Sequence, residues 1–185
     1  KREQHATMIS YAITDPSTLD FNYLERDLKR FSQKASMIVY RDKSASSMYA
    51  VDFVKAAKLF DFETVLIHGN PVLANATEAD GVHLSSVQLD EIPDAKAMNL
   101  FVVVSTHTIE ELKKAEALGA DMATFSPIFE TPNKGLPVGL EILRSVTSQV
   151  NIPVLALGGI LTEEQITACE LSGASGFASI RYFGG

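Results

Sequence analysis

The sequence predicts an α/β protein, a (β/α)8 TIM barrel that lacks the last helix. Eight short apolar runs alternate with seven segments of helical periodicity, which is typical of a parallel sheet. No linker or low-complexity tract divides the 185 residues, so a single barrel domain is expected over 1–185. Polar residues follow many of the apolar runs. A closed barrel would bring them to one face, which favours closure over an open doubly wound sheet.

The composition excludes several classes of protein. The chain is 46% hydrophobic with a net charge of -7, so we expect a globular fold, no nucleic-acid partner and no membrane partner. Cys169 is the only cysteine and lies in a helical pattern, which favours packing over a reactive thiol. No apolar run approaches the roughly 18 residues that a membrane span needs. A cytoplasmic location is the default expectation.

Apolar runs that stop at polar residues define the first three strand–helix units. Residues 1–7 are interpreted as an appended segment before a native start at Met8, and 8–14 form the first strand. A helical stripe follows, made of Leu19, Tyr23, Leu24, Leu28 and Phe31. The next two strands are expected over 36–40 and 64–67, with a helix over about 46–60 between them and a short helix after the third strand.

Helix-capping signals mark the later units. Thr108 with Glu111, and Thr162 with Gln165, match the capping box, in which a threonine N-cap is followed three residues later by Glu or Gln. Glycines then end both helices. The remaining strands are expected over 80–84, 99–104, 120–125, 152–157 and 176–180.

The longest irregular segment covers 126–139. It holds three prolines, two glycines and a lone Lys134. A loop of this length in a compact domain is usually a lid or a binding loop, and the alternative is a long connection without a role.

A phosphate pocket is indicated where the last two strands end. Gly158 and Gly159 follow the seventh strand, and glycines let a backbone approach an anion with its N–H groups. Arg181 adds a positive charge at the end of the eighth strand, which is where phosphate sites of such barrels lie. The alternative is that the glycine pair only makes a tight turn.

Other strand ends carry further candidates. His83 lies inside the fourth strand, where a hydrogen-bonded core residue is the more common role than a ligand or base. Arg41 and Lys43 follow the second strand and could equally be a solvated turn. The residues expected to converge at one face are Arg41, Lys43, His68, Ser105, His107, Lys134, Gly158, Gly159 and Arg181.

Seven motifs, taken in order, resemble the thiamin phosphate synthase and thiazole tautomerase family. They are YAITD (11–15), YRDK (40–43), ADGVHL (79–84), STHTIEEL (105–112), SPIFETPNKG (126–135), VGLE (138–141) and PVLALGGI (153–160). The resemblance implies a barrel that binds a small-molecule thiazole phosphate. Gly159 and the backbone at Ile180 and Arg181 would hold the phosphate. Residues Thr131, Asn133 and Lys134 would lie over the ligand.

The synthase branch implies a metal that this chain is not equipped to hold. Synthases of the family transfer a pyrimidine methyl group from its diphosphate and hold Mg²⁺ with aspartates after strands three and four. The corresponding positions are Gly69 and Gln88, and Asp90 is a displaced substitute. Val39 stands where the family has a glutamine that contacts the pyrimidine. No metal is therefore expected unless the synthase alternative holds.

The tautomerase branch needs an acid/base group and no metal. A glycine at position 69 and FET in the long loop resemble that branch, but its histidine corresponds to Pro127 here. His68 is the first candidate for proton transfer and His107 the second, because an ordinary histidine has a near-neutral pKa.

Three functions follow from these patterns. The preferred one is a metal-independent, tautomerase-like isomerase. The alternatives are a divergent thiamin phosphate synthase and a catalytically silent barrel that binds a phosphorylated ligand or regulates a partner. Because the chain stops just after the eighth strand, we expect a homo-oligomer or an omitted tail to cover the exposed flank.

Overall fold

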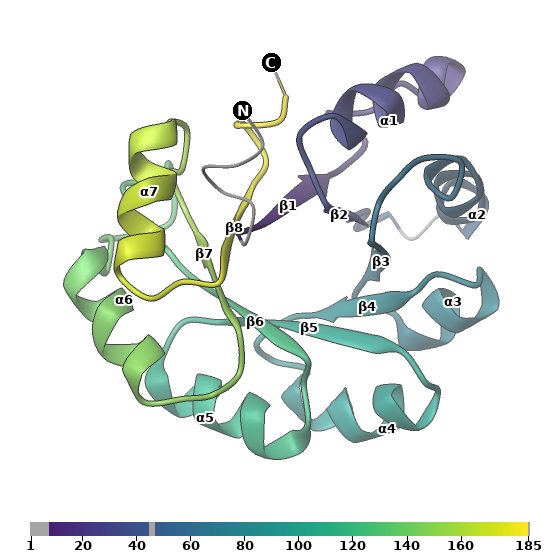
Figure 1. The fold of residues 1–185 in the computed structure, drawn as a ribbon. Helices are drawn as coiled ribbons and strands as arrows, with labels where there is room; N and C mark the ends of the chain where they lie inside the picture. Colours follow the sequence, from purple (N-terminus) through teal and green to yellow (C-terminus); the bar gives the residue numbers. More distant parts are fainter. Residues whose placement is uncertain (1–7, 45–46, 185) are drawn as a thin grey trace.

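Eight parallel strands close into one barrel, in chain order, with β8 paired to β1 (Figure 1). The computed structural model describes residues 8–44 and 47–184. The strands are β1 (Ile9–Thr14), β2 (Met37–Tyr40), β3 (Thr64–His68), β4 (Gly81–Leu84), β5 (Phe101–Thr106), β6 (Met122–Phe125), β7 (Val154–Leu157) and β8 (Gly176–Ser179). The predicted TIM barrel is confirmed. The proposed appended segment, 1–7, lies outside the described residues.

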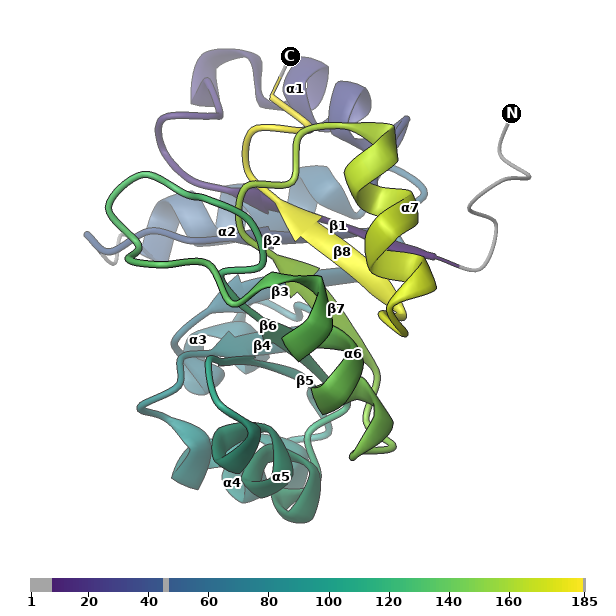
Figure 2. The same cartoon turned by 90° about the vertical axis from the view of Figure 1, so that its left-hand side faces the viewer.

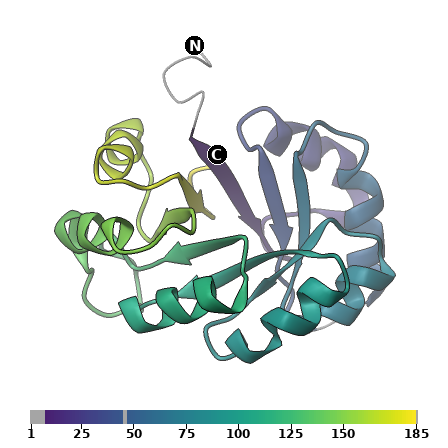
Figure 3. The ribbon, with the colours of Figure 1, turned by 60° about the horizontal axis from the view of Figure 1, so that its bottom comes forward.

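Helices lie outside the strands and enclose the barrel (Figures 1 and 3). In the described part of the chain they are α1 (Leu24–Ser32), α2 (Ser47–Ala57), α3 (Pro71–Ala76), α4 (Ile92–Ala97), α5 (Ile109–Leu118), α6 (Gly139–Ser148) and α7 (Glu163–Leu171), with 3-10 turns η1 (Phe21–Tyr23) and η2 (Leu89–Glu91). None of these helices is long and apolar enough to cross a membrane. The cytoplasmic location stays a prediction.

The flank after β8 is covered differently from the expectation. No helix follows β8 among the described residues, which end at Gly184. The rings of Tyr182 and Phe183 lie instead against Phe177 of β8, with centroids 5.3 and 5.7 Å away. Phe183 is buried. These rings cover part of the apolar surface that prompted the homo-oligomer expectation, which no contact here tests.

The strands divide the buried side chains into two groups, because successive residues of a strand point to opposite faces. One group packs between the strands and the helices. The other fills the barrel interior and contains Tyr11, Ile13, Met37, Val39, Leu66, Val103, Leu155 and Ala178. Two residues beyond the last of these on their strands, Arg41, His68 and Ser105 continue on the interior side. The alternation therefore places polar residues above an apolar floor.

Several element boundaries differ from the sequence prediction, and two of the differences have clear local reasons. Tyr23 was placed in the inward stripe, yet its side chain is 58% exposed. A 3-10 turn capped by Asp20 precedes α1 and changes the phase of the helix before Leu24. The fifth strand begins at Phe101 rather than 99, because Asn99 adopts a left-handed backbone conformation with φ 61°.

The capping box of α7 gives a direct stability prediction. Thr162 Oγ1 accepts from the backbone N–H of Gln165, whose side chain accepts from the backbone N–H of Thr162. Thr162→Ala should lower the free energy of unfolding by about 1 kcal/mol, because it leaves a helix-terminal N–H without its partner. Urea denaturation measures this loss. Thr167→Ala, an exposed site within α7, is the matched control, and an equal loss there would contradict the capping assignment.

Candidate functional site

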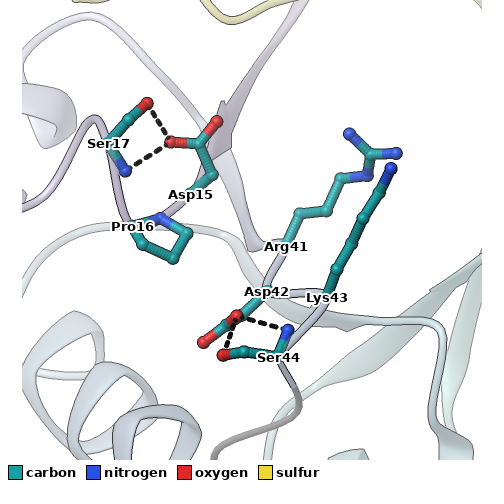
Figure 4. Close-up of a pocket in the computed structure, with 7 residues that line it drawn as sticks. All are labelled: Asp15, Pro16, Ser17, Arg41, Asp42, Lys43 and Ser44. Atoms are coloured by element: carbon teal, nitrogen blue, oxygen red, sulfur yellow. Dashed lines mark hydrogen bonds between the residues drawn. The ribbon is translucent and has the colours of Figure 1, made fainter.

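The ends of β1 and β2 border a shallow hollow of about 360 Å³. It is lined by Asp15, Pro16, Ser17, Arg41, Asp42, Lys43 and Ser44. Figure 4 shows the Arg41 and Lys43 side chains extending in the same direction, whereas Asp42 points away from them. The alternation of an extended backbone explains why residues two apart share a side.

The two acids of this hollow are occupied by local hydrogen bonds. The Asp15 carboxylate accepts from the N–H and hydroxyl of Ser17 at 2.8 and 2.6 Å. The Asp42 carboxylate accepts from Ser44 in the same way and from the Tyr40 hydroxyl at 2.8 Å. Within residues 8–44 and 47–184, no carboxylate forms an ion pair with Arg41 or Lys43. Both positive charges are therefore available to an anionic ligand.

A buried polar group lies below the rim, inside the barrel. His83 is 3% exposed, its Nδ1 lies 2.8 Å from the Tyr11 hydroxyl, and its Nε2 lies 2.8 Å from the Ser105 hydroxyl. Burial, followed by the charges of His68 and Arg41, lowers the pKa of His83 to about 3. The sequence interpretation of His83 as a hydrogen-bonded core residue is confirmed.

His68 lies at the top of this group. Its ring centroid is 5.4 Å from that of His83. Burial, followed by the nearby charges of Arg41 and Lys43, lowers the pKa of His68 to about 4. This pKa is below the near-neutral value that motivated the choice of His68 as an acid/base group. At neutral pH the ring is neutral, so it can take part in hydrogen bonds but holds no proton to donate as an imidazolium.

The depressed histidine pKa values predict how stability depends on pH. A histidine whose pKa is about 4 in the folded protein and 6.5 in the unfolded chain binds protons preferentially when unfolded. The contribution of this neutral histidine to the free energy of unfolding is complete above pH 6.5 and is lost as the pH falls towards 4. Each such group can contribute up to about 1.4 kcal/mol per pH unit, less where solvent reaches the ring.

His68→Asn should therefore flatten the pH dependence of the free energy of unfolding between pH 6.5 and 4. The residual slope would come from other groups, including His83, whose window extends to pH 3. Urea denaturation of both proteins across this range measures the difference. Parallel curves for the variant and the wild type would contradict the assignment.

His107 lies apart from the interior group. It is exposed at the end of β5, where its Nδ1 lies 3.1 Å from the backbone carbonyl of Ser126 and 3.3 Å from the Ser126 hydroxyl. Among the described residues, no ring contact joins His107 to His68 or His83. The two histidines proposed for proton transfer are thus not brought together.

The glycine pair after β7 lets the loop between β6 and α6 pack against the barrel. Gly158 and Gly159 have φ values of 113° and 68°. A Cβ at Gly158 would lie 2.7 Å from Pro127 Cα, and one at Gly159 would overlap the carbonyl oxygen of Glu130. The N–H of Phe129 donates to the Gly158 carbonyl at 3.0 Å. The glycines therefore permit a close contact with the loop, which does not decide between the tight-turn alternative and anion binding.

Free backbone donors lie beside this contact. In the described part of the chain, no group accepts a hydrogen bond from the N–H of Gly159, Ile180 or Arg181. Arg181 is exposed at the end of β8. The arrangement has the donors that a phosphate requires.

The three loop residues expected over the ligand lie in the segment between β6 and α6, which Figure 2 shows as a wide excursion from the barrel. Asn133 and Lys134 are exposed, and Asn133 has φ 62°. The Thr131 hydroxyl donates to the Phe129 carbonyl at 3.1 Å. Their role over a ligand stays a proposal.

A family model and the relatives described below agree on one family. A family model described as thiamine monophosphate synthase matches residues 10–183. The chain belongs to the thiamine monophosphate synthase family. A putative thiamine-phosphate synthase 2 from Aquifex aeolicus is 37% identical over 179 residues, covering 94% of this chain and 96% of that protein.

Two further relatives extend the comparison. A thiamine-phosphate synthase from Syntrophomonas wolfei is 32% identical over 185 residues, covering 92% of this chain and 85% of that protein. The solved structure of a thiamine phosphate pyrophosphorylase from Pyrococcus furiosus superposes with a TM-score of 0.76 at 26% identity, covering 96% of this chain and 88% of that one.

The thiamine monophosphate synthase family implies a Mg²⁺ ion, and this chain lacks the carboxylates that would bind it after β3 and β4. Gly69 supplies no carboxylate. The Gln88 amide nitrogen donates to the Gly69 carbonyl at 2.8 Å and to Glu91 Oε2 at 2.9 Å, while its oxygen accepts from the Ser85 N–H at 2.9 Å. An amide therefore ties the ends of β3 and β4 together where a carboxylate ligand was expected.

Asp90, the displaced aspartate, does not supply the missing metal ligand. Asp90 is exposed and forms an ion pair with Lys114 at 3.0 Å. Across the described residues, no group of three or more His, Cys, Asp or Glu side chains could hold a metal ion. Mg²⁺ requires several hard oxygen ligands in octahedral geometry. The side chains of this family member do not fit that metal.

Sequence reasoning missed two interior residues. Tyr11 was part of an expected strand, and Thr124 part of another, but neither was singled out. The Thr124 hydroxyl is buried and has no hydrogen-bond partner among residues 8–44 and 47–184. The signal that could have found them is the period-two pattern, which places polar atoms at Tyr11 and Thr124 on an otherwise apolar interior face.

Proposed function

We propose that this chain is a thiamine-phosphate synthase, a transferase that moves the hydroxymethylpyrimidine group from its diphosphate to thiazole phosphate. Arg41 and Lys43, which form no ion pair with any carboxylate of the described residues, carry the proposal, because a diphosphate leaving group needs positive charge. The matched relatives named as synthases support a transferase over the isomerase that the sequence alone favoured.

Two groups of potential anion-binding residues would suit a reaction between two phosphorylated substrates. The diphosphate would bind at Arg41 and Lys43, and the thiazole phosphate at the free N–H groups of Gly159, Ile180 and Arg181. The interior side of β3, β4 and β5 presents His68, His83 and Ser105, which could contact the rings of the substrates. Each substrate would then have its own anchor, with the rings held in between.

The transfer needs charge stabilisation more than proton transfer. The bond from the pyrimidine methylene carbon to the diphosphate oxygen breaks, the diphosphate leaves with the electron pair, and the methylene carbon forms a new bond to the thiazole nitrogen. Arg41 and Lys43 would stabilise the negative charge that grows on the leaving oxygen. Neutral His68 and His83 suit a reaction that takes no proton from a histidine.

A tautomerase remains the second candidate because the expected metal ligands are replaced by Gly69 and Gln88. That reaction shifts a double bond and needs no diphosphate site. It would leave the Arg41 and Lys43 pair without a use.

Product analysis separates the candidates. The purified protein would be incubated with the pyrimidine diphosphate and thiazole phosphate, with and without Mg²⁺, and separately with thiazole carboxylate phosphate. The proposal predicts thiamine phosphate and one equivalent of pyrophosphate. Isomerisation of the carboxylate without transfer would replace the proposal by the tautomerase. No turnover in either assay, with thiazole phosphate still bound, would indicate a binding barrel.

A further inference from the structure

Three residues from distant parts of the chain form a hydrogen-bonded row across the barrel interior. Tyr11 lies on β1, His83 on β4 and Ser105 on β5, and both contacts measure 2.8 Å. Tyr11 is 0% exposed, and its ring stacks on that of His83 at a centroid distance of 5.7 Å. The row therefore holds the imidazole through both ring nitrogens.

The direction of the two hydrogen bonds follows from which hydroxyl proton, that of Tyr11 or that of Ser105, can be left without an acceptor inside the row. If Ser105 donated to His83 Nε2, then Nδ1 would donate to Tyr11, and the phenolic proton would need another acceptor. The described residues offer none. A buried hydroxyl proton without a partner is unfavourable. If Tyr11 donates instead, only the proton of the Ser105 hydroxyl is left over, and Ser105 is partly exposed, so this proton can meet solvent or a ligand.

The charge states agree with this direction. Burial raises the pKa of Tyr11 well above its ordinary value, so the phenol keeps its proton. His83 is neutral at physiological pH and carries one ring proton, since its pKa is about 3. A Tyr11 proton on the Nδ1 side places the imidazole proton on Nε2, where it donates to Ser105.

We infer that Tyr11 and His83 are positioning residues that fix the Ser105 hydroxyl as a hydrogen-bond donor towards the ring of the bound substrate. The inference deepens the proposed function and rests on it for the identity of that ring. The acceptor would be a ring nitrogen of the pyrimidine or the thiazole, the two heteroaromatic rings in the proposed reaction.

Thr124 independently points to a polar ligand atom at this place. It pairs in register with Ser105 on the neighbouring strand, so the two side chains share the interior face. Its buried hydroxyl has no partner among the described residues. Such a group is normally satisfied by water or ligand. Two adjacent hydroxyls thus present hydrogen-bonding capacity that the protein itself does not use.

Nuclear magnetic resonance of the histidine ring tests the direction without needing turnover. In protein labelled with ¹⁵N in histidine, His83 signals are assigned by their loss in His83→Gln. The inference predicts the tautomer with the proton on Nε2 in the wild type and loss of that single tautomer in Tyr11→Phe. Tyr182→Phe is the matched control, because it removes a tyrosine hydroxyl that donates to Glu163 instead. It should leave the His83 signals unchanged.

Kinetics separates a positioning role from a structural one. Tyr11→Phe should lower kcat for the transfer by about 10- to 100-fold with KM values within threefold of the wild type. A wild-type His83 protonated on Nδ1 would overturn the inference, and so would a Tyr11→Phe protein with unchanged tautomer and kcat. If no transfer occurs but the Nε2 tautomer is found, the proposed function fails while the direction of the row stands.

Discussion

Replacement of both Arg41 and Lys43 by alanine should lower kcat/KM for the pyrimidine diphosphate by about 100-fold or more. Each cation would donate charge-assisted hydrogen bonds of about 1.5–3 kcal/mol to the diphosphate, and each 1.4 kcal/mol corresponds to a factor of ten. Neither side chain forms an ion pair with another described residue, so the fold should be unaffected. Steady-state kinetics and circular dichroism of the double variant measure both effects.

Lys113→Ala is the matched control for this change. Lys113 is exposed on α5, where it lines neither anion site. It should retain wild-type kinetics. Arg41→Lys adds a finer test, because a point charge cannot replace the planar fork that binds two phosphate oxygens. A double variant with kinetics within threefold of the wild type would exclude the two cations from the diphosphate site.

Gly159→Ala should reduce both stability and phosphate binding. The residue has φ 68°, and an added Cβ would overlap the Glu130 carbonyl oxygen and lie 3.0 Å from Phe129 Cβ. Overpacking and a left-handed alanine together should lower the free energy of unfolding by about 2–4 kcal/mol. The loop would move away from β7, and the affinity for thiazole phosphate should fall by about tenfold or more. Urea denaturation and calorimetry measure the two quantities.

Gly135→Ala separates backbone strain from steric overlap. Gly135 lies in the same loop with φ 73°, but an added Cβ would have no atom within 4 Å. It should lose only about 1 kcal/mol, the cost of the left-handed conformation alone. Equal losses at both positions would show that the contact between Gly159 and the loop is unimportant.

The sequence predicted the barrel because its signals are local. Apolar runs and the threonine caps of α5 and α7 depend on neighbouring residues, and Thr108 and Thr162 accept from the predicted N–H groups. Strand ends were less accurate, since Asn99 and the 3-10 turn before α1 alter the backbone without a clear sequence pattern.

The hydrogen-bonded row of Tyr11, His83 and Ser105 could not be predicted, because its contacts join residues that are far apart in the sequence. His83 contacts residues 72 and 22 positions away, and only the strand register brings them together. The same holds for the pKa of His68, which depends on burial and on the charges of Arg41 and Lys43. The missing metal carboxylates were visible in the sequence. The hydrogen bond from the Gln88 amide to the Gly69 carbonyl at the end of β3 was not visible in the sequence.

The sequence alone and the comparisons with relatives favour different functions. Missing carboxylates favoured the tautomerase from sequence alone, whereas the relatives carry the names of synthases. The structure adds a hollow lined by Arg41 and Lys43, two cations that pair with no carboxylate among the described residues. The account therefore assigns the diphosphate to Arg41 and Lys43 and no metal ligand to β3 or β4.

A crystal soaked with inorganic pyrophosphate and Mn²⁺ tests this claim most directly, because anomalous scattering locates the metal. The account predicts pyrophosphate in contact with Arg41 and Lys43, and no manganese coordinated by protein oxygen atoms at the ends of β3 and β4. Manganese bound there by protein ligands, with pyrophosphate attached to it and away from the two cations, would contradict the account.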